Sequence, residues 1–329
     1  MRGVSNSLDV TVIGAAVMDV LAGAVGPQVF DIGSMPMEYI RTSYGGDALN
    51  EAVVLSKLGR KTELITRLGE DDVGARTMQF LRENGVRIQR TTVTDEYPSS
   101  VNIVLVDEKG ERYFLTDPRS CLRKLSESDI IPNIADMADI VSFASIFVSP
   151  LLRIASLERI FKQIKEPIKI GDSEKKRILL TDVTKPKNGE GLSDIACLLP
   201  HIDYFLANED EIAMLTGVKD AAENARRLIE EGANCVVIKR GKNGCLIRTK
   251  EEQFEIPVYT VEKVVDSTGA GDGFAAGFLY GLSEGYCLED CGRFGCAVAS
   301  CIVETVGGSE GLESIEEPRR RFDILKNNS

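Results

Sequence analysis

Apolar runs typical of β-strands alternate with helical patterns along this chain, and no other feature limits its fold as strongly. The helical stretches ALNEAVVLSKLG (48–59) and DDVGARTMQFLRENG (71–85) each end in Gly, which is common just after helices. We therefore predict an α/β fold in which helices flank a doubly wound, mostly parallel sheet. Its predicted strands are residues 9–14, 62–69, 139–146, 177–183, 203–208, 234–241 and 244–249.

Two stretches interrupt this alternation. Residues 22–44 break the rhythm, and VNIVLVDEKGERYFL (101–115) has alternating strands around DEKGER, which predicts a hairpin turn. We predict that both stretches form a small separate β-sheet. No repeat or linker divides the sequence, so we expect one domain over residues 1–329, with a tail from about Pro318.

The charge of the chain limits its partners. The formal net charge is −12, and the clusters of Lys and Arg that a nucleic-acid or membrane surface needs are not seen. No apolar run approaches the roughly 18 residues of a membrane span, and no signal-peptide pattern precedes the first strand. The single His argues against a Ser-His or Cys-His nucleophile. We expect a cytoplasmic protein that acts on small molecules.

The stretch VDSTGAGDGFAAGF (265–278) predicts an anion-binding turn. Gly269, Ala270 and Gly271 place backbone N–H groups before a helix with no bulky side chains in the way, and the helix dipole adds partial positive charge. Asp272 follows this turn directly. Its carboxylate would either accept a proton from a hydroxyl that attacks a bound phosphate, or only cap the helix.

The same stretch resembles the C-terminal signature of the ribokinase-like (PfkB) family of carbohydrate kinases. Three further motifs follow the family's order: GGDALNEA (45–52) is similar to its N-terminal signature, NEDE (208–211) to its NxxE element, and KRGKNG (239–244) to its strand-turn with two glycines. The early strand is also expected to end in an acid, here Asp19. The resemblance covers most of the chain and implies a kinase that uses ATP and Mg²⁺.

The resemblance implies that the γ-phosphoryl group of ATP passes to a sugar hydroxyl. Asp272 would be the base, and the N–H groups of the anion-binding turn would bear the developing charge. Asp19 at the end of the first strand and the helix opening after Gly46 would both lie at the carboxyl edge of the sheet, where open α/β folds bind ligands. The implied sugar-binding residues are Asp19, Gly45, Gly46 and Asn50.

The cofactor residues also follow from the resemblance. Asn208 and Glu211 would orient water around Mg²⁺, although from the residues alone they also fit a plain capped helix. Lys185 and its neighbour Lys187 could meet a phosphate or an acidic substrate, or only add solubility. The ATP molecule would lie across Lys239, Gly241 and Gly244 and against the helix that contains Cys296.

In many relatives a monovalent cation lies behind the anion-binding turn. Asp266 and Thr268 match its usual ligands, and counting from Asp272 adds Ile302, Thr305 and Gly307. Whether K⁺ is required here stays open. The small sheet, 22–44 and 101–115, resembles the family's lid, which closes over the sugar and in some members forms a dimer contact, so a homodimer through the lid is one expectation.

The sequence departs from some members of the family. SFASIFVSP (142–150) has no acid where ribose-specific relatives place a Glu, and DVTKPKN (182–188) lacks the Asn and Arg of many fructokinase-like members. We therefore expect a hexose, a ketohexose or a keto-sugar acid as substrate. A nucleoside kinase of the same family and a noncatalytic sugar-binding regulator stay open, whereas the missing glycine fingerprint argues against a dinucleotide-dependent oxidoreductase.

Overall fold

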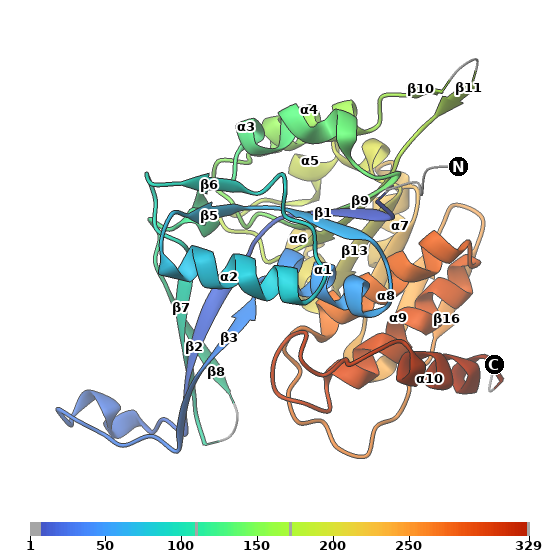
Figure 1. Cartoon of the computed structure of the whole chain (residues 1–329). Coiled ribbons are helices and arrows are strands. Elements are labelled where there is room, and N and C mark those ends of the chain that lie inside the picture. Colours follow the sequence, from blue (N-terminus) through green and yellow to red (C-terminus); the bar gives the residue numbers. More distant parts are fainter. Residues whose placement is uncertain (1–7, 109–110, 171–172, 328–329) are drawn as a thin grey trace, which may run out of the picture.

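The computed structural model describes residues 8–108, 111–170 and 173–327, and an eight-stranded sheet lies at its centre (Figure 1). The strand order is β16-β15-β14-β13-β12-β9-β1-β4, and β15 and β16 are antiparallel additions to a parallel sheet. The strands are β1 (Val10–Ile13), β4 (Thr62–Ile65), β9 (Ile140–Ile146), β12 (Ile178–Val183), β13 (Tyr204–Asn208), β14 (Val236–Lys239), β15 (Cys245–Arg248) and β16 (Gln253–Ile256).

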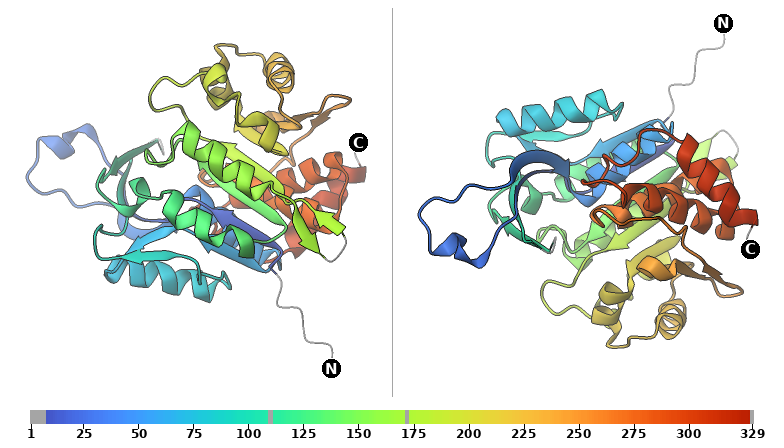
Figure 2. Two further views of the ribbon diagram at one scale, coloured as in Figure 1. Left: turned by 90° about the horizontal axis from the view of Figure 1, so that it is seen from above. Right: turned by 90° about the horizontal axis from the view of Figure 1, so that it is seen from below.

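Helices cover both faces of this sheet, which confirms the predicted α/β class (Figures 1 and 2). Successive side chains of a strand alternate, so Ile140 and Ala144 of β9 enter one core while Val141 and Phe143 enter the other. The first core is closed by α1 (Asp47–Lys57), α2 (Asp72–Glu83), α8 (Ala270–Glu284), α9 (Leu288–Ile302) and α10 (Glu316–Asn327). The second is closed by α3 (Glu127–Ile130), α4 (Ile154–Ile164), α5 (Leu192–Ile195), α6 (Glu209–Thr216) and α7 (Ala221–Glu230).

The remaining elements are short. Residues 62–69, predicted as one strand, divide into β4 and β5, because β5 pairs with β6 outside the main sheet. Within the described part of the chain, no helix has the length and apolar character needed to cross a bilayer. The short elements are β5 (Arg67–Gly69), β6 (Thr92–Thr94), β10 (Ile168–Ile170), β11 (Ser173–Lys175), η1 (Pro27–Phe30), η2 (Cys121–Arg123), η3 (Ile131–Asp136), η4 (Leu199–His201) and η5 (Gly241–Asn243).

A separate four-stranded sheet, which we call the lid, projects from one end of the main sheet (Figures 1 and 2). The lid confirms the small sheet expected from the sequence, although its first strand starts earlier and much of 22–38 is η1 and loop. The predicted hairpin joins two antiparallel strands, and its centre, residues 109–110, lies outside the described residues. The lid strands are β2 (Val17–Gly23), β3 (Tyr39–Gly45), β7 (Val101–Val106) and β8 (Arg112–Thr116).

The predicted tail from about Pro318 is wrong, because these residues form most of α10. Phe322 and Leu325 are buried in the first core, and the Phe322 ring stacks on Tyr286 with 5.5 Å between ring centroids. The guanidinium of Arg321 is also buried and pairs with Glu304 and Glu317. The many charged residues of this segment make its apolar face, which packs on α9, difficult to recognise in the sequence.

Replacing Phe322 tests whether α10 is part of the core. We expect Phe322→Ala to lower the free energy of unfolding by about 3 kcal/mol, because it removes a buried, stacked ring. Urea denaturation measures this change. Ile324→Ala is the control on the exposed side of the same helix and should change the free energy by less than about 1 kcal/mol. Equal small effects of both substitutions would contradict the packing of α10.

Candidate active site

A pocket of about 350 Å³ opens between the lid and the end of the main sheet. Its walls come from parts of the chain that are far apart in sequence: the lid, the start of α1, the start of α8 and the segment after α9. Many predicted site residues meet here. The pocket is lined, among others, by Asp19, Gly45, Gly46, Asp47, Asn50, Asn102, Arg112, Thr268, Gly269, Asp272 and Gly307.

The start of α8 forms the predicted anion-binding turn. Gly269 is the N-cap residue with φ 72°, and a Cβ at this position would lie 2.4 Å from Cα of Gly308, so no larger residue fits. The Ala270 N–H closes the turn by donating to the Ser267 carbonyl at 3.2 Å. Gly271 is also confined, because a Cβ there would approach the Lys239 ammonium to 3.3 Å. The turn therefore has no bulky side chain over its backbone, and it lies beside the partly buried Lys239 ammonium.

Asp272 does not act as the N-cap of this helix. The N-cap is Gly269, so Asp272 is the third helical residue, and Asn50 Nδ2 donates to its Oδ2 at 2.7 Å. This hydrogen bond joins α8 to the neighbouring α1 at the wall of the pocket. Burial, and next the nearby charge of Asp47, raise the pKa of Asp272 to about 8. The carboxyl group thus has the position and the near-neutral pKa of a general base.

A cluster of carboxyl groups surrounds Lys239 below the turn. The Lys239 ammonium pairs with Asp182 at the end of β12. Burial alone would lower the pKa of Lys239, but Asp182 and Glu211 raise it above its ordinary value. Burial also raises the pKa of Glu211 to about 7 and that of Asp47 above its usual range. One partly buried ammonium group therefore faces the buried Asp182 carboxylate and the half-buried carboxyl groups of Asp47 and Glu211.

Three acids near this cluster were not identified from the sequence, although they lie within or beside the motifs. Asp47 and Glu51 belong to GGDALNEA, and Asp182 begins DVTKPKN. Glu51 is 1% exposed, accepts a hydrogen bond from the Ser142 hydroxyl at 2.6 Å, and has a pKa raised well above its usual value by burial. The position of Glu51 inside an apolar helical pattern was the sequence signal that could have identified it.

Asn208 and Glu211 form a capping box at the start of α6. Asn208 Oδ1 accepts from the Glu211 N–H, and Glu211 Oε2 accepts from the Asn208 N–H, both at 2.9 Å. The capped helix is therefore present, but Glu211 is not a solvated residue, because it belongs to the buried cluster around Lys239. Glu211 Oε2 accepts the hydrogen bond of the capping box, and Oε1 takes no part in the cap.

The other predicted cofactor residues are spread more widely. Gly241, the first residue of η5, and Gly244, which follows η5, adopt positive φ values of 52° and 77° in the turn between β14 and β15. Lys185 is exposed after β12. Cys296 is only 3% exposed and its thiol faces Cys245, so the α9 segment around it is core rather than open surface.

The sugar-binding prediction placed Asp19 on the wrong element. The first strand ends at Ile13, and Asp19 lies in β2 of the lid, because the chain turns at residues 14–16 and starts a new strand. Asn102 Nδ2 of β7 donates to Asp19 Oδ1 at 2.9 Å, and burial raises the pKa of Asp19. A Cβ at Gly45 would lie 2.9 Å from Asp19 Oδ2. Asp19 still lines the pocket, but from the lid side.

The helix opening at Gly46 keeps the position predicted for it. Gly46 has φ 95°, and a Cβ there would lie 2.7 Å from the Ala15 carbonyl oxygen, so the turn into α1 needs glycine. Asn50 follows one helical turn later and is 4% exposed. Its Oδ1 is buried without a hydrogen-bond partner among the described residues. An unused acceptor at the pocket wall can receive a ligand hydroxyl.

The predicted monovalent-cation residues gather behind the anion-binding turn. The Thr268 and Gly307 N–H groups each donate to the Asp266 carboxylate at 3.0 Å. Arg112 of lid strand β8 pairs with the same carboxylate. The Thr305 N–H donates weakly, at 3.4 Å, to the Ile302 carbonyl in the adjoining segment.

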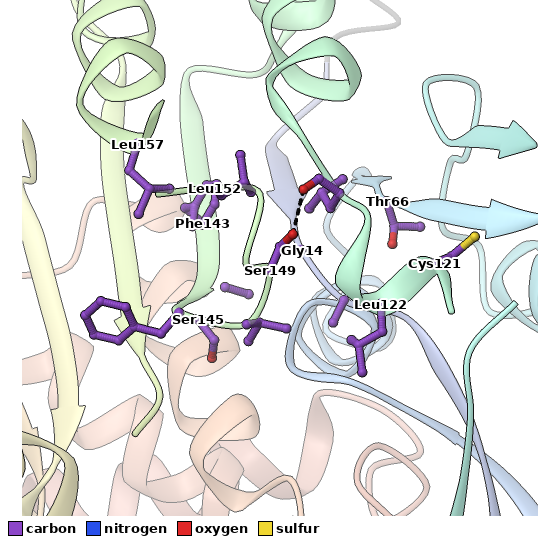
Figure 3. Close-up of a pocket in the computed structure, with 14 residues that line it drawn as sticks. Gly14, Thr66, Cys121, Leu122, Phe143, Ser145, Ser149, Leu152 and Leu157 are labelled. Carbon is purple, nitrogen blue, oxygen red and sulfur yellow. Dashed lines mark hydrogen bonds between the residues drawn. The ribbon is translucent and has the colours of Figure 1, made fainter. Parts of the chain in front are cut away.

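A second, much smaller cavity lies behind the pocket (Figure 3). Its volume of about 20 Å³ gives room for about one water molecule, and its walls are mostly apolar. The Ser149 hydroxyl donates to the Leu125 carbonyl at 2.6 Å and closes one side. Leu122 of η2 lies across the cavity from Phe143 of β9.

Comparison with known proteins identifies relatives over nearly the whole chain. The model of the family described as "pfkB family carbohydrate kinase" matches residues 7–315. A protein of Archaeoglobus fulgidus described as an uncharacterized sugar kinase is 35% identical over 260 residues, which is 78% of this chain and 97% of that protein. A 2-dehydro-3-deoxygluconokinase of Haemophilus influenzae is 25% identical, with 91% of this chain and 98% of the relative covered.

Solved structures support the fold. Arabidopsis thaliana ribokinase in complex with ribose and ATP superposes with a TM-score of 0.80 at 22% identity, covering 96% of this chain and 99% of that chain. A putative ribokinase II from E. coli in complex with ATP and Mg²⁺ gives a TM-score of 0.79 at 21% identity, with the same coverage. Both place the chain in the ribokinase-like fold.

The raised pKa of Asp272 predicts how activity depends on pH. A base must be ionised, and a carboxyl group with a pKa of about 8 is protonated below that pH. We therefore expect kcat/KM, which reports the free enzyme, to rise about tenfold per pH unit up to about pH 8 and then level off. Asp47→Asn removes a charge that raises this pKa, so the rise should move to lower pH. A flat profile from about pH 6 to 9 in both proteins would contradict the assignment.

Proposed function

The chain belongs to the pfkB family of carbohydrate kinases, and from this premise we propose that Asp272 activates a sugar hydroxyl for attack on the γ-phosphoryl group of ATP. One observation carries the proposal. Asp272 lies beside the anion-binding turn, lines the pocket, and accepts a hydrogen bond from the neighbouring Asn50, which also lines the pocket, instead of capping the helix. A hydroxyl held in this pocket would thus be near both a base and backbone N–H groups.

We assign sugar binding to the two sides of the pocket. Asp19 and Asn102 on the lid offer a carboxylate and an amide that are already joined by a hydrogen bond. Asn50 on α1 offers the unused Oδ1 atom. Gly45 and Gly46 line the same pocket, and the lack of a side chain at Gly45 leaves the Asp19 carboxylate room to face the ligand. Carboxylate and amide groups on facing walls suit a ligand with several hydroxyls.

The proton and the charge then take separate routes. The attacking hydroxyl gives its proton to the Asp272 carboxylate as the oxygen–phosphorus bond forms. The charge on the transferred group would be stabilised by N–H groups of Gly269, Ala270 and Gly271 and by the partial positive charge at the start of α8. Lys239 beside Gly271 adds a fixed cation to the same region.

We place ATP and Mg²⁺ next to this turn. Several acids surround the single Lys239 ammonium. Carboxylate oxygens are ligands that Mg²⁺ prefers, and the ion is commonly held by one or two carboxylates together with several water molecules. Asn208 and Glu211 would therefore hold the ion through water, and bound Mg²⁺ neutralises charge on the phosphates. Gly241 and Gly244 would border the nucleotide, and the buried Cys296 side chain of α9 would lie in the core layer behind it. Lys185 would reach the phosphates only by extending from the surface.

The lid has two proposed roles. Over the sugar it would exclude water, which otherwise takes the phosphoryl group. On its outer face Ile40 is 70% exposed, and Ile103, Tyr113 and Leu115 are also exposed. These side chains lie on one face of the sheet, because Ile103 pairs with Leu115 in register. We place the contact of a homodimer on this apolar face.

The substrate we favour is a hexose, a ketohexose or a keto-sugar acid. The pocket walls carry charged and amide groups that suit hydroxyls, and Phe114 is the exposed aromatic ring among its lining residues. A nucleoside kinase is the second candidate, because a relative in Methanocaldococcus jannaschii, 26% identical over 299 residues, is named a nucleoside kinase. ATP consumption also fits the cytoplasmic location expected from the sequence.

Substitution of Asp272 tests the mechanism. We expect Asp272→Asn to lower kcat by at least about 100-fold while leaving KM for ATP and sugar within a few-fold, because general-base catalysis contributes about 10² to 10⁴. Coupled ADP release measures kcat. The melting temperature is the control for folding, since Asn retains the shape of Asp. A folded variant with more than about a tenth of wild-type kcat would remove Asp272 from the mechanism.

Potassium tests the cation assignment. We propose that K⁺ binds near Asp266, Thr268 and Gly307, with Ile302 and Thr305 as further ligands, and orders the anion-binding turn. At fixed ionic strength we expect K⁺ to raise both kcat/KM and the melting temperature above their values in tetramethylammonium. Asp266→Asn should abolish both increases. Identical values in the two salts would contradict the cation site and leave the kinase function intact.

A further inference from the structure

Two cationic side chains, Arg123 and Lys187, line the boundary between the substrate pocket and a neighbouring pocket of about 550 Å³. Among the described residues, neither forms an ion pair with a carboxylate. The third cation of the substrate pocket, Arg112, differs because it pairs with Asp266. Glu190 of the neighbouring pocket accepts hydrogen bonds from the backbone N–H groups of Lys187 and Asn188 and so offsets part of this positive charge. The Arg123 guanidinium still has no carboxylate partner among the described residues.

The backbone of Arg123 is fixed, but the hydrogen-bond donors of its guanidinium have few acceptors. Its segment η2 is fixed because the Leu122 N–H donates to the Ser100 hydroxyl at 2.6 Å. The guanidinium makes one long hydrogen bond, from Nη1 to the Val148 carbonyl at 3.4 Å, and its Nε is buried without a partner. Buried donors that lack acceptors cost free energy, and a carboxylate or phosphate offers acceptors that match the guanidinium.

The opposite charge is found elsewhere in the same pocket. Asp19, Asp47 and Asp272 line it from the lid, α1 and α8. An anionic group on a ligand would be repelled by these acids but attracted to Arg123 and Lys187. Because the chain has a net charge of −12, local cations of this kind favour binding of an anion at this place. The distribution of charge would thus orient a ligand that has an anionic group at one end and a free hydroxyl at the other.

We propose that the substrate is a sugar with a carboxylate or phosphate group, which Arg123 and Lys187 bind while a hydroxyl at the far end reaches Asp272. This inference rests on the proposed kinase function and narrows its substrate class. The neighbouring pocket, lined also by Arg153 and Asn188, gives the anionic end room to extend. A neutral sugar or a nucleoside would leave the two cations without a partner.

Matched substrates test the class. Wild-type kcat/KM is measured by ADP release for D-fructose against D-fructose 6-phosphate, for D-glucose against D-gluconate, and for 2-dehydro-3-deoxy-D-gluconate. We expect at least one anionic sugar to exceed both neutral sugars by about tenfold or more, and the arm that responds tells phosphate from carboxylate. If neutral sugars react equally well or better, the inference fails and the kinase proposal stands. If no sugar reacts, the proposed function itself fails.

Substitutions then test the two residues. For the preferred anionic sugar, Arg123→Gln and Lys187→Met should each raise KM about 10-fold to 100-fold and leave kcat, KM for ATP and the KM of neutral sugars within a few-fold. Arg119→Gln is the matched control, because its side chain is 86% exposed and pairs only locally with Asp117. If both variants keep the wild-type KM, Arg123 and Lys187 do not bind the anion. A general structural defect would instead change kcat and all KM values together.

Discussion

The burial of several carboxyl groups around a single ammonium group is the constraint on which the site depends. Lys239 can neutralise only one charge, and it pairs with Asp182. The others must be protonated, accept hydrogen bonds or meet a cation from outside, since buried unpaired charge is costly. Asp272 uses the second solution through Asn50, and Glu211 through its helix cap. Burial first, and the neighbouring carboxylates next, raise the pKa values of Asp272 to about 8 and of Glu211 to about 7, near the range where proton transfer is effective.

Short-range patterns predicted most of the fold. The main-sheet strands and the first helices follow from apolar periodicity, and two of the four motifs, GGDALNEA and VDSTGAGDGFAAGF, supply residues that line the pocket. The errors have physical reasons. Asp19 was placed on the first strand because nothing local reveals that the chain breaks at residues 14–16 and pairs anew with β3 and β7. α10 was taken for a tail because Phe322 and Leu325 stand among charged residues.

Contacts between distant segments could not be predicted from the sequence. Asn102 meets Asp19 across 83 residues and Asp182 meets Lys239 across 57, and both contacts depend on strand order and register. The unpaired state of Arg123 is likewise a property of the folded chain, because it depends on which acids lie near η2. The residue types in the motifs indicate which chemical groups the site contains. Only the folded arrangement shows which of the charged groups are already paired.

The ion pair between Arg112 and Asp266 has one more consequence. It joins a strand of the lid to the loop where we place the monovalent cation. A cation and a guanidinium would compete for one carboxylate, so cation binding and lid position become linked functions. The coupling is reciprocal. If cation binding favours release of the lid by a given free energy, release of the lid favours cation binding by the same free energy. Salt composition would thus act on the lid as an effector.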